Sequence, residues 1–288
     1  MEVIRAEVLG FCGGVRRAVA MIEAAASQAG TIYTLHAIVH NQHVMSRLRS
    51  SGIIQVASIS QIPDGATVAI TAHGAPMPTL AALEARGLTL IDTTCPIVRD
   101  AQRVVSENAR ANRFTIIYGD GDHLEVRGLL SHAGGLAVAT ESLDALEIPA
   151  EGKLALVSQT TKSPQALQAF AEELRANLAR DIDLLVQDTT CQEPVARYRA
   201  ARSLASRVDA MVVVGSRDSA NTQNLLRICQ ESEKPTLFAE SADDIESSRF
   251  PRARTIGLTA GASTPDRIID AVEQKLRQLD SEVLEHPI

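Results

Sequence analysis

Aromatic side chains are scarce in this sequence: they make up 3% of its 288 residues, and tryptophan is missing altogether. The interior must therefore be built from alanine, valine, leucine and isoleucine, as in parallel strands that helices cover on both faces. Long apolar runs are missing too, since none approaches the roughly 20 residues that a membrane span needs. Residues 1–7 lack the charged and then apolar build of a signal peptide. We therefore expect a cytoplasmic α/β protein with no membrane partner.

A surplus of positive charge is also lacking, because 28 lysines and arginines stand against 35 aspartates and glutamates, a formal net charge of -7. This balance argues against a general surface for nucleic acid or membranes. With 45% hydrophobic and 22% charged residues, the chain is typical of globular proteins. An anionic ligand would have to be held by local donors and not by the field of the whole protein.

Close pairs of cysteines are absent. The four cysteines, Cys12, Cys95, Cys191 and Cys229, lie far apart, and disulfides are rare in a long chain without a secretory signal. Metal binding or catalysis is therefore a better interpretation of these cysteines than disulfide bonding. Structural zinc sites usually draw ligands from close pairs such as C-x-x-C, which weakens the case for zinc held by three thiolates and a water.

Short apolar runs recur along the chain, each followed by a polar or glycine-bearing turn and a helical pattern. This order predicts parallel sheets with right-handed crossovers, in which functional groups gather at the carboxyl ends of the strands. The runs are residues 68–70, 114–118, 154–157, 211–214 and 256–258, and helices are predicted over residues 16–28, 165–178, 193–207, 222–231 and 266–279.

A weak internal repeat divides the chain. The tetrapeptide Asp-Thr-Thr-Cys follows an apolar run at residues 92–95 and again at residues 188–191. Together with Cys12, these copies predict three pseudo-repeated lobes around one shared centre. The predicted lobes are residues 1–94, 95–188 and 189–288, each small for an independent domain.

Three of the cysteines have surroundings that suit an iron–sulfur cluster. Two glycines follow Cys12 and would let the backbone approach a bulky group, while Cys95 and Cys191 end the two repeats. A [4Fe–4S] cluster with three protein thiolates keeps one iron open for a substrate oxygen. The competing interpretation is that these cysteines are ordinary small core residues. Cys229 lies on an apolar helical stripe and is predicted to be core.

Polar residues suited to an anionic, hydroxylated ligand stand at the predicted strand ends. Each alone is weak evidence, because a single histidine in a loop is more often structural, and a serine or asparagine before a helix is usually an N-cap. Their combination is more informative. They are His40, Asn41, His73, His123, Glu125, Gln159, Thr160, Thr161, Ser219, Asn221 and Ser263.

Eight motifs follow one another through nearly the whole chain. They are Gly-Phe-Cys-Gly-Gly-Val-Arg-Arg-Ala at residues 10–18, Val-His-Asn at 39–41, Ala-His-Gly at 72–74, Asp-Thr-Thr-Cys-Pro at 92–96, His-Leu-Glu-Val at 123–126, Gln-Thr-Thr at 159–161, Asp-Thr-Thr-Cys at 188–191 and Thr-Ala-Gly-Ala-Ser at 259–263. In these motifs the sequence resembles the 4-hydroxy-3-methylbut-2-enyl diphosphate reductases.

The resemblance implies a trefoil of three α/β lobes around a [4Fe–4S] cluster. Its three protein ligands would be Cys12, Cys95 and Cys191, and the fourth iron would take the substrate hydroxyl. The reaction implied is the last step of the methylerythritol phosphate pathway of isoprenoid biosynthesis. In it, this oxidoreductase converts (E)-4-hydroxy-3-methylbut-2-enyl diphosphate to isopentenyl and dimethylallyl diphosphates, with ferredoxin or flavodoxin as the electron donor.

The resemblance also implies roles for the polar residues. Glu125 would supply the proton to the leaving hydroxyl, and Thr160 would relay or position it. The residues that would hold the diphosphate are His40, His73, His123, Ser219, Asn221 and Ser263. Backbone N–H groups support this assignment, because Ser219, Asn221 and Ser263 stand near the starts of predicted helices, where anions bind.

The sequence departs from the family pattern in places. Ala220 stands where a second serine commonly follows Ser219, the segments after Cys95, after Cys191 and at residues 128–132 differ, and the tail after Leu279 is short. Two alternatives therefore stay open: a divergent relative that reduces another allylic hydroxyl substrate, and a non-catalytic iron–sulfur binding or sensing protein. The complete cysteine trio beside an acid argues against a sensor, and the retained phosphate-binding residues argue against another substrate.

Overall fold

The computed structural model describes residues 1–39, 41–144, 146, 152–179, 182–246, 250 and 253–285. They contain three four-stranded sheets flanked by helices, and the described strand ladders are parallel. The predicted α/β class is therefore confirmed. The chain forms two compact units: unit 1 is Met1–Arg16, Val39–Ser50 and Gln192–Ile288, and unit 2 is Arg17–Ile38 and Ser51–Cys191.

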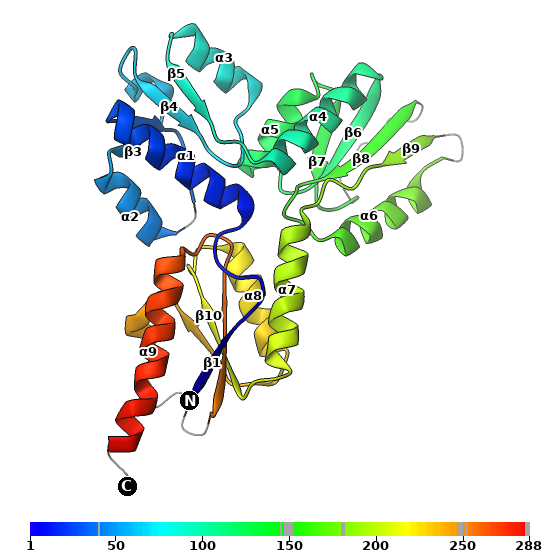
Figure 1. Ribbon diagram of the computed structural model, residues 1–288. Helices are drawn as coiled ribbons and strands as arrows, with labels where there is room; N and C mark the ends of the chain where they lie inside the picture. The colour runs from blue at the N-terminus through cyan, green and yellow to red at the C-terminus, as the bar shows by residue number, and fades with distance from the viewer. Residues whose placement is uncertain are drawn as a thin grey trace. The chain divides into compact units, whose positions relative to one another are not determined.

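Unit 1 holds one sheet, with the strand order β1-β12-β10-β11 (Figure 1). Its strands are β1 (Glu2–Arg5), β10 (Ala210–Val214), β11 (Thr236–Ala239) and β12 (Thr255–Ala260). Its helices are α2 (Gln42–Ser50), α7 (Gln192–Ala205), α8 (Ala220–Gln230) and α9 (Asp266–Glu285), with a short 3-10 turn at Ala242–Asp244.

The central strand β10 is buried along its whole length because helices cover both faces of the sheet. Val212 and Val214 pack with apolar residues of α9 on one face. Met211 and Val213 point the other way and pack with α7 and α8. This arrangement explains the unbroken apolar run at residues 211–214, since a strand buried on both faces shows no alternation.

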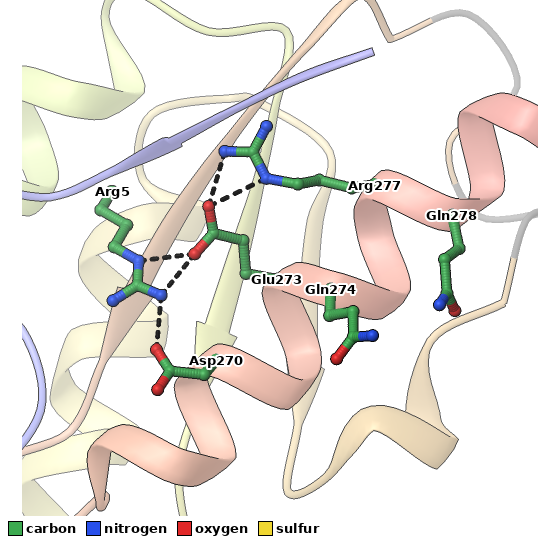
Figure 2. A pocket seen from close by; sticks show the side chains of 6 residues that line it. All are labelled: Arg5, Asp270, Glu273, Gln274, Arg277 and Gln278. Atoms are coloured by element: carbon green, nitrogen blue, oxygen red, sulfur yellow. Dashed lines mark hydrogen bonds and ion pairs between the residues drawn. The ribbon is translucent and has the colours of Figure 1, made fainter.

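Ion pairs fasten the N-terminal strand of unit 1 to its last helix (Figure 2). Arg5 donates to Glu273 at 2.7 Å and to Asp270 at 2.6 Å, and Arg277 donates to Glu273 at 2.6 Å. Burial opposes ionisation of Glu273, but the hydrogen bonds from Arg277 and Arg5 outweigh it and lower the pKa of this carboxyl. A cavity of about 480 Å³ beside them is lined by these mutually compensated charges, so we assign the cluster a structural role.

Unit 2 holds two sheets, with the strand orders β3-β2-β4-β5 and β7-β6-β8-β9. Their strands are β2 (Ile32–Thr34), β3 (Ile53–Gln55), β4 (Thr67–Ile70), β5 (Thr89–Asp92), β6 (Arg113–Tyr118), β7 (Ala137–Thr140), β8 (Lys153–Ser158) and β9 (Asp183–Val186). The helices are α1 (Gly13–Ala29), whose first residues belong to unit 1, α3 (Met77–Ala85), α4 (Pro96–Arg110), α5 (Leu124–His132) and α6 (Pro164–Asn177), with a 3-10 turn at Ile59–Gln61.

The second sheet of unit 2 also has two covered faces. Ile117 and Val157 pack with α4 and α5, whereas Ile116 and Leu156 pack with α6. Helices α4 and α5 begin directly after Cys95 and His123, so the core that holds these helices also positions two of the predicted site loops.

The predicted helices begin within three residues of their observed starts. Two segments of the first predicted lobe, Met1–Arg16 and Val39–Ser50, belong to unit 1 together with Gln192–Ile288, and the division into lobes 1–94, 95–188 and 189–288 stays a prediction. Strand β1 lies in the first predicted lobe but pairs with β12, so it completes the sheet of the C-terminal segment. Such a pairing between distant segments leaves no local pattern in the sequence, because it depends on contacts and not on periodicity.

Candidate functional site

The two copies of Asp-Thr-Thr-Cys in unit 2 adopt the same hydrogen-bonded turn. One carboxylate oxygen of Asp92 accepts the Thr94 N–H at 2.9 Å and its hydroxyl at 2.5 Å. Asp188 accepts the Thr190 N–H at 2.8 Å and its hydroxyl at 2.5 Å. The aspartate therefore fixes the backbone directly before each cysteine, as an Asx turn does.

Equivalent contacts hold each repeat to the neighbouring strand end. The Cys95 N–H donates to the Ala72 carbonyl at 2.9 Å, and the Cys191 N–H donates to the Thr160 carbonyl at 2.7 Å. Both cysteines stand at the start of a helix: Cys95 is the N-cap of α4, and Cys191 directly precedes α7. The repeat seen in the sequence is thus a repeat of structure, and it leaves both thiols partly exposed.

Cys12 in unit 1 has a related setting before α1. Its N–H donates to the Ala262 carbonyl at 3.1 Å, and its sulfur accepts the Val15 N–H at 3.4 Å. Apart from its chain neighbours, no described atom lies within 4 Å of the position a Cβ would take at Gly13, so the residue after Cys12 has open space around it. The positive end of a helix dipole stabilises the anionic thiolate that a metal needs, and all three predicted ligands stand at such an end.

Cys229 is a core residue, as predicted. Its side chain is 0% exposed on α8, and burial raises the pKa of its thiol to about 12. None of the four cysteines, all of which the structure describes, forms a disulfide.

We expect Cys229→Ala to lower stability without loss of iron. The substitution opens a small void in a well-packed core, which should cost about 1–2 kcal/mol in urea unfolding. Iron and sulfide per protein should match the wild type. A variant that lost its iron at equal folded fraction would contradict the structural assignment of Cys229.

The three predicted thiolate ligands are distributed over both units, with Cys12 in unit 1 and Cys95 and Cys191 in unit 2. Within the described residues, no group of three or more His, Cys, Asp or Glu side chains is arranged to hold a single metal ion. The meeting of the three thiols at one cluster stays a prediction.

Glu125 is a buried acid in the first turn of α5, and its side chain is held by Thr160. It is 1% exposed, and its carboxyl accepts the Thr160 N–H at 2.6 Å and the Thr160 hydroxyl at 2.9 Å. Burial raises the pKa of Glu125, although the two hydrogen bonds from Thr160 act in the opposite direction. A protonated carboxyl in this place can act as a general acid.

Thr160 connects the acid to a predicted metal ligand. Its N–H and hydroxyl bind Glu125, while its carbonyl accepts the N–H of Cys191. The sequence motif Gln-Thr-Thr at residues 159–161 singled out this threonine, and the structure brings it together with Glu125.

Two of the predicted histidines also meet in unit 2. The rings of His73 and His123 pack edge to face, with centroids 5.5 Å apart. His123 is the N-cap of α5, and its Nδ1 accepts the N–H of Glu125 at 3.2 Å, which leaves Nε2 as the protonated nitrogen of the neutral ring. His123 and Glu125 are thus placed by the same helix start.

The predicted diphosphate residues of unit 1 lie on two neighbouring loops at the carboxyl edge of its sheet. Ser219 is the N-cap of α8 and is 7% exposed, and Asn221 lies in the first turn of that helix. Ser263 is 9% exposed and lies between β12 and α9. These positions agree with the predicted helix starts, whereas His40 lies outside the described residues.

Tight packing around Thr222 joins these two loops. A Cβ at Gly261 would lie 2.1 Å from the Thr222 hydroxyl oxygen, and a Cβ at Gly215 would lie 2.7 Å from its methyl carbon. Only glycine fits at either strand end, since real Cβ contacts are never so short.

We expect Gly261→Ala to destabilise the protein by about 1–3 kcal/mol through overpacking. Urea unfolding measures the loss. Gly128→Ala is the matched control, because that glycine lies inside α5 with only ordinary contacts. Alanine there should leave the free energy of unfolding unchanged or raise it by about 0.5–1 kcal/mol. Equal stabilities of the two variants would refute the predicted clash.

The loop before Ser219 borders a polar cavity of about 380 Å³ in unit 1. At its wall, the backbone N–H of Arg217 donates to the Glu240 carboxylate at 2.9 Å, and the guanidinium of Arg217 packs over the ring of Phe238. The residues that line the cavity include Asn41, His43, Ser216, Arg217, Asp218 and Glu240.

Two arginines were not predicted as site residues, although each binds a backbone carbonyl in a loop of the candidate site. Arg17 donates to the Thr94 carbonyl at 3.2 Å, next to Cys95, and Arg197 donates to the Ala260 carbonyl at 2.6 Å. The spacing of Glu193 and Arg197 on one predicted helix indicates an ion pair. Nothing in the neighbouring sequence indicates that Arg197 is buried.

Comparisons with known proteins identify the family. The model of the LytB protein family matches residues 3–277. A relative from Dehalococcoides mccartyi strain CBDB1, named 4-hydroxy-3-methylbut-2-enyl diphosphate reductase, is 39% identical over 284 residues, which cover 98% of this chain and 99% of that protein.

Two solved structures share the fold. One is described as (E)-4-hydroxy-3-methyl-but-2-enyl diphosphate reductase, the terminal enzyme of the non-mevalonate pathway; it is 31% identical with a TM-score of 0.80, over 96% of this chain and 99% of that one. The other, an E-1-hydroxy-2-methyl-but-2-enyl-4-diphosphate reductase from Plasmodium falciparum, is 27% identical with a TM-score of 0.82, over 99% of this chain and 88% of that one. The chain belongs to the LytB protein family.

Proposed function

We propose that this protein reduces (E)-4-hydroxy-3-methylbut-2-enyl diphosphate to isopentenyl and dimethylallyl diphosphates, the last step of the methylerythritol phosphate pathway. Two electrons and two protons are consumed, the allylic C–O bond breaks, and the hydroxyl leaves as water. Named relatives and solved structures that match nearly the whole chain support this activity. The observation that carries it is the buried acid Glu125, held by Thr160 next to the Cys191 loop.

The proposed cofactor is a [4Fe–4S] cluster on Cys12, Cys95 and Cys191. The donor set fits: three partly exposed thiols, each at the start of a helix, suit a cluster, whereas the fully buried Cys229 does not. When bound, the cluster supplies an open iron for the substrate oxygen and delivers the two electrons. Ferredoxin or flavodoxin is the proposed donor.

Glu125 is the proposed proton source, and Thr160 its relay. The threonine hydroxyl can accept a proton on one side and donate one on the other, and its contact with the carboxyl is already formed. Burial keeps the Glu125 carboxyl protonated to higher pH than an exposed glutamate. The proton would pass to the departing hydroxyl, which leaves more easily as water than as hydroxide.

The diphosphate is the proposed ligand of His40, His73, His123, Ser219, Asn221 and Ser263. Of these residues, the two serines and the asparagine stand at or near the N-termini of α8 and α9. The backbone N–H groups of a helix's first turn and the helix dipole favour anions there. This local attraction explains how a chain with a net charge of -7 can bind a highly charged anion.

Anaerobic purification followed by addition of substrate and a chemical reductant tests the proposal. Conversion to the two five-carbon diphosphates supports it. A brown protein without turnover would favour one of the alternatives, a relative with another allylic substrate or an iron–sulfur sensor. A colourless protein with bound zinc would refute the cofactor as well as the reaction. No described helix is long and apolar enough to cross a membrane, and the cytoplasmic location stays a prediction.

A further inference from the structure

Arg197 is a buried arginine on α7 to which the proposed reaction gives no task. It is 1% exposed, although arginine is almost never fully buried unless it is paired. Its Nη2 donates to both carboxylate oxygens of Glu193, at 2.9 and 3.1 Å, and its Nη1 donates to the Ala260 carbonyl at 2.6 Å. A buried charge is costly even when it is paired. The contacts of the Arg197 guanidinium should therefore show what its burial is for.

The carbonyl that Arg197 binds lies at an edge that the sheet leaves open. Strand β12 lies between β1 and β10, and the Leu258 carbonyl accepts the Ala6 N–H just beyond the end of β1. Carbonyls two residues apart point to the same side of a strand, so the Ala260 carbonyl points to the side where β1 has already ended. Arg197 supplies the donor that a longer β1 would have supplied.

The loop that follows Ala260 carries one residue of the proposed site and anchors another. The Ala262 carbonyl accepts the N–H of Cys12 at 3.1 Å, and Ser263 is the next residue. On the other side, the Gly261 N–H donates to the Val214 carbonyl of β10 at 2.9 Å. The loop is therefore anchored to β10 on one side and to Arg197 on the other.

We propose that Arg197 is a positioning residue that holds the loop at residues 261–263 in the form that binds diphosphate and anchors Cys12. The proposal rests on the proposed function, because it takes the diphosphate as the ligand of Ser263. Glu193 compensates the buried charge of Arg197 and fixes its guanidinium so that one nitrogen faces Ala260. The expected consequence of losing Arg197 is a loop that still exists but is no longer preorganised for its ligand.

The test compares Arg197→Met and Arg197→Lys with Arg202→Met, a control on the same helix whose guanidinium is exposed and pairs with Glu231 at 3.4 Å. For Arg197→Met, we expect KM for the allylic diphosphate to rise about tenfold with kcat within about threefold. The dissociation constant of inorganic diphosphate, measured by calorimetry, should rise by a similar factor. Arg197→Lys keeps the charge and a single donor nitrogen and should lie between wild type and Arg197→Met, while Arg202→Met should match the wild type.

Hydrogen exchange in the protein without its cluster gives a second readout. Peptides that cover residues 258–265 and the Cys12 amide should lose protection in both Arg197 variants. Unchanged KM, diphosphate affinity and exchange in variants as folded as the wild type would overturn the proposal. If Arg197→Met does not fold, Arg197→Lys decides.

The same experiments separate this proposal from the proposed function. A wild-type protein that binds diphosphate without turnover defeats the reduction, yet its diphosphate affinity still tests Arg197. A wild-type protein that does not bind diphosphate overturns both.

Discussion

Glu125→Gln should retain the cluster and lose about 10³-fold in kcat, because a general acid typically contributes about 10²–10⁴-fold. Glutamine keeps the shape and the contacts, since its oxygen can accept the Thr160 N–H and its amide can donate to the Thr160 hydroxyl. What it lacks is a transferable proton. Turnover measured anaerobically, with iron and sulfide content as the check on the cluster, isolates that loss.

The control for this variant is Glu107→Gln, which removes an exposed carboxylate paired with Arg103 on α4 and should leave turnover unchanged. Full activity of Glu125→Gln would remove the proton-donating role from Glu125, and loss of its iron would show that the residue is needed to build the site instead.

The pH dependence of kcat tests the proton-donating role of Glu125 independently. Burial raises the pKa of Glu125, so the proton to be donated is present below the raised value and is lost as the pH rises through it. The kcat of the wild type should therefore fall on the alkaline side of its profile. The residual rate of Glu125→Gln should lack this decline; a decline in both proteins would assign the titration to another group.

Cys95→Ser should lose most of its iron and sulfide and, with them, turnover by on the order of 100-fold or more. Mutation of groups that only orient metal ligands already costs about 10–100-fold, and the loss of a ligand should cost at least as much. Serine is nearly isosteric and can keep the backbone bond to Ala72 that fixes residue 95. The fold should therefore persist, with an unfolding transition close to that of the wild-type protein without its cluster.

The comparison with Cys229→Ala shows whether the loss of iron is specific to a predicted ligand. Both variants lack one thiol, but only Cys95 is partly exposed at a helix start, whereas Cys229 is core. Iron retained in Cys95→Ser and lost in Cys229→Ala would reverse our assignment of the ligands.

Part of the geometry of the candidate site was predictable from the sequence because the candidate residues lie in short motifs at strand ends. The repeat Asp-Thr-Thr-Cys predicted two equivalent loops, and the two copies make the same aspartate–threonine contacts. The resemblance to the reductases also implied that Thr160 relays or positions the proton of Glu125, and the structure joins these two residues by hydrogen bonds. Local patterns of this kind are encoded residue by residue, through turn chemistry and helix starts.

By itself, the sequence determined the α/β class, the positions of five strands and five helices, and the residues that end those strands, because periodicity and capping act over a few neighbouring residues. Only the tertiary structure decided that β1 completes the sheet of the C-terminal segment, that Glu125 is almost fully buried, and that Arg197 replaces a missing strand partner. Each of these depends on which distant segments meet, and burial is a property of the whole packed chain and not of any stretch of its sequence.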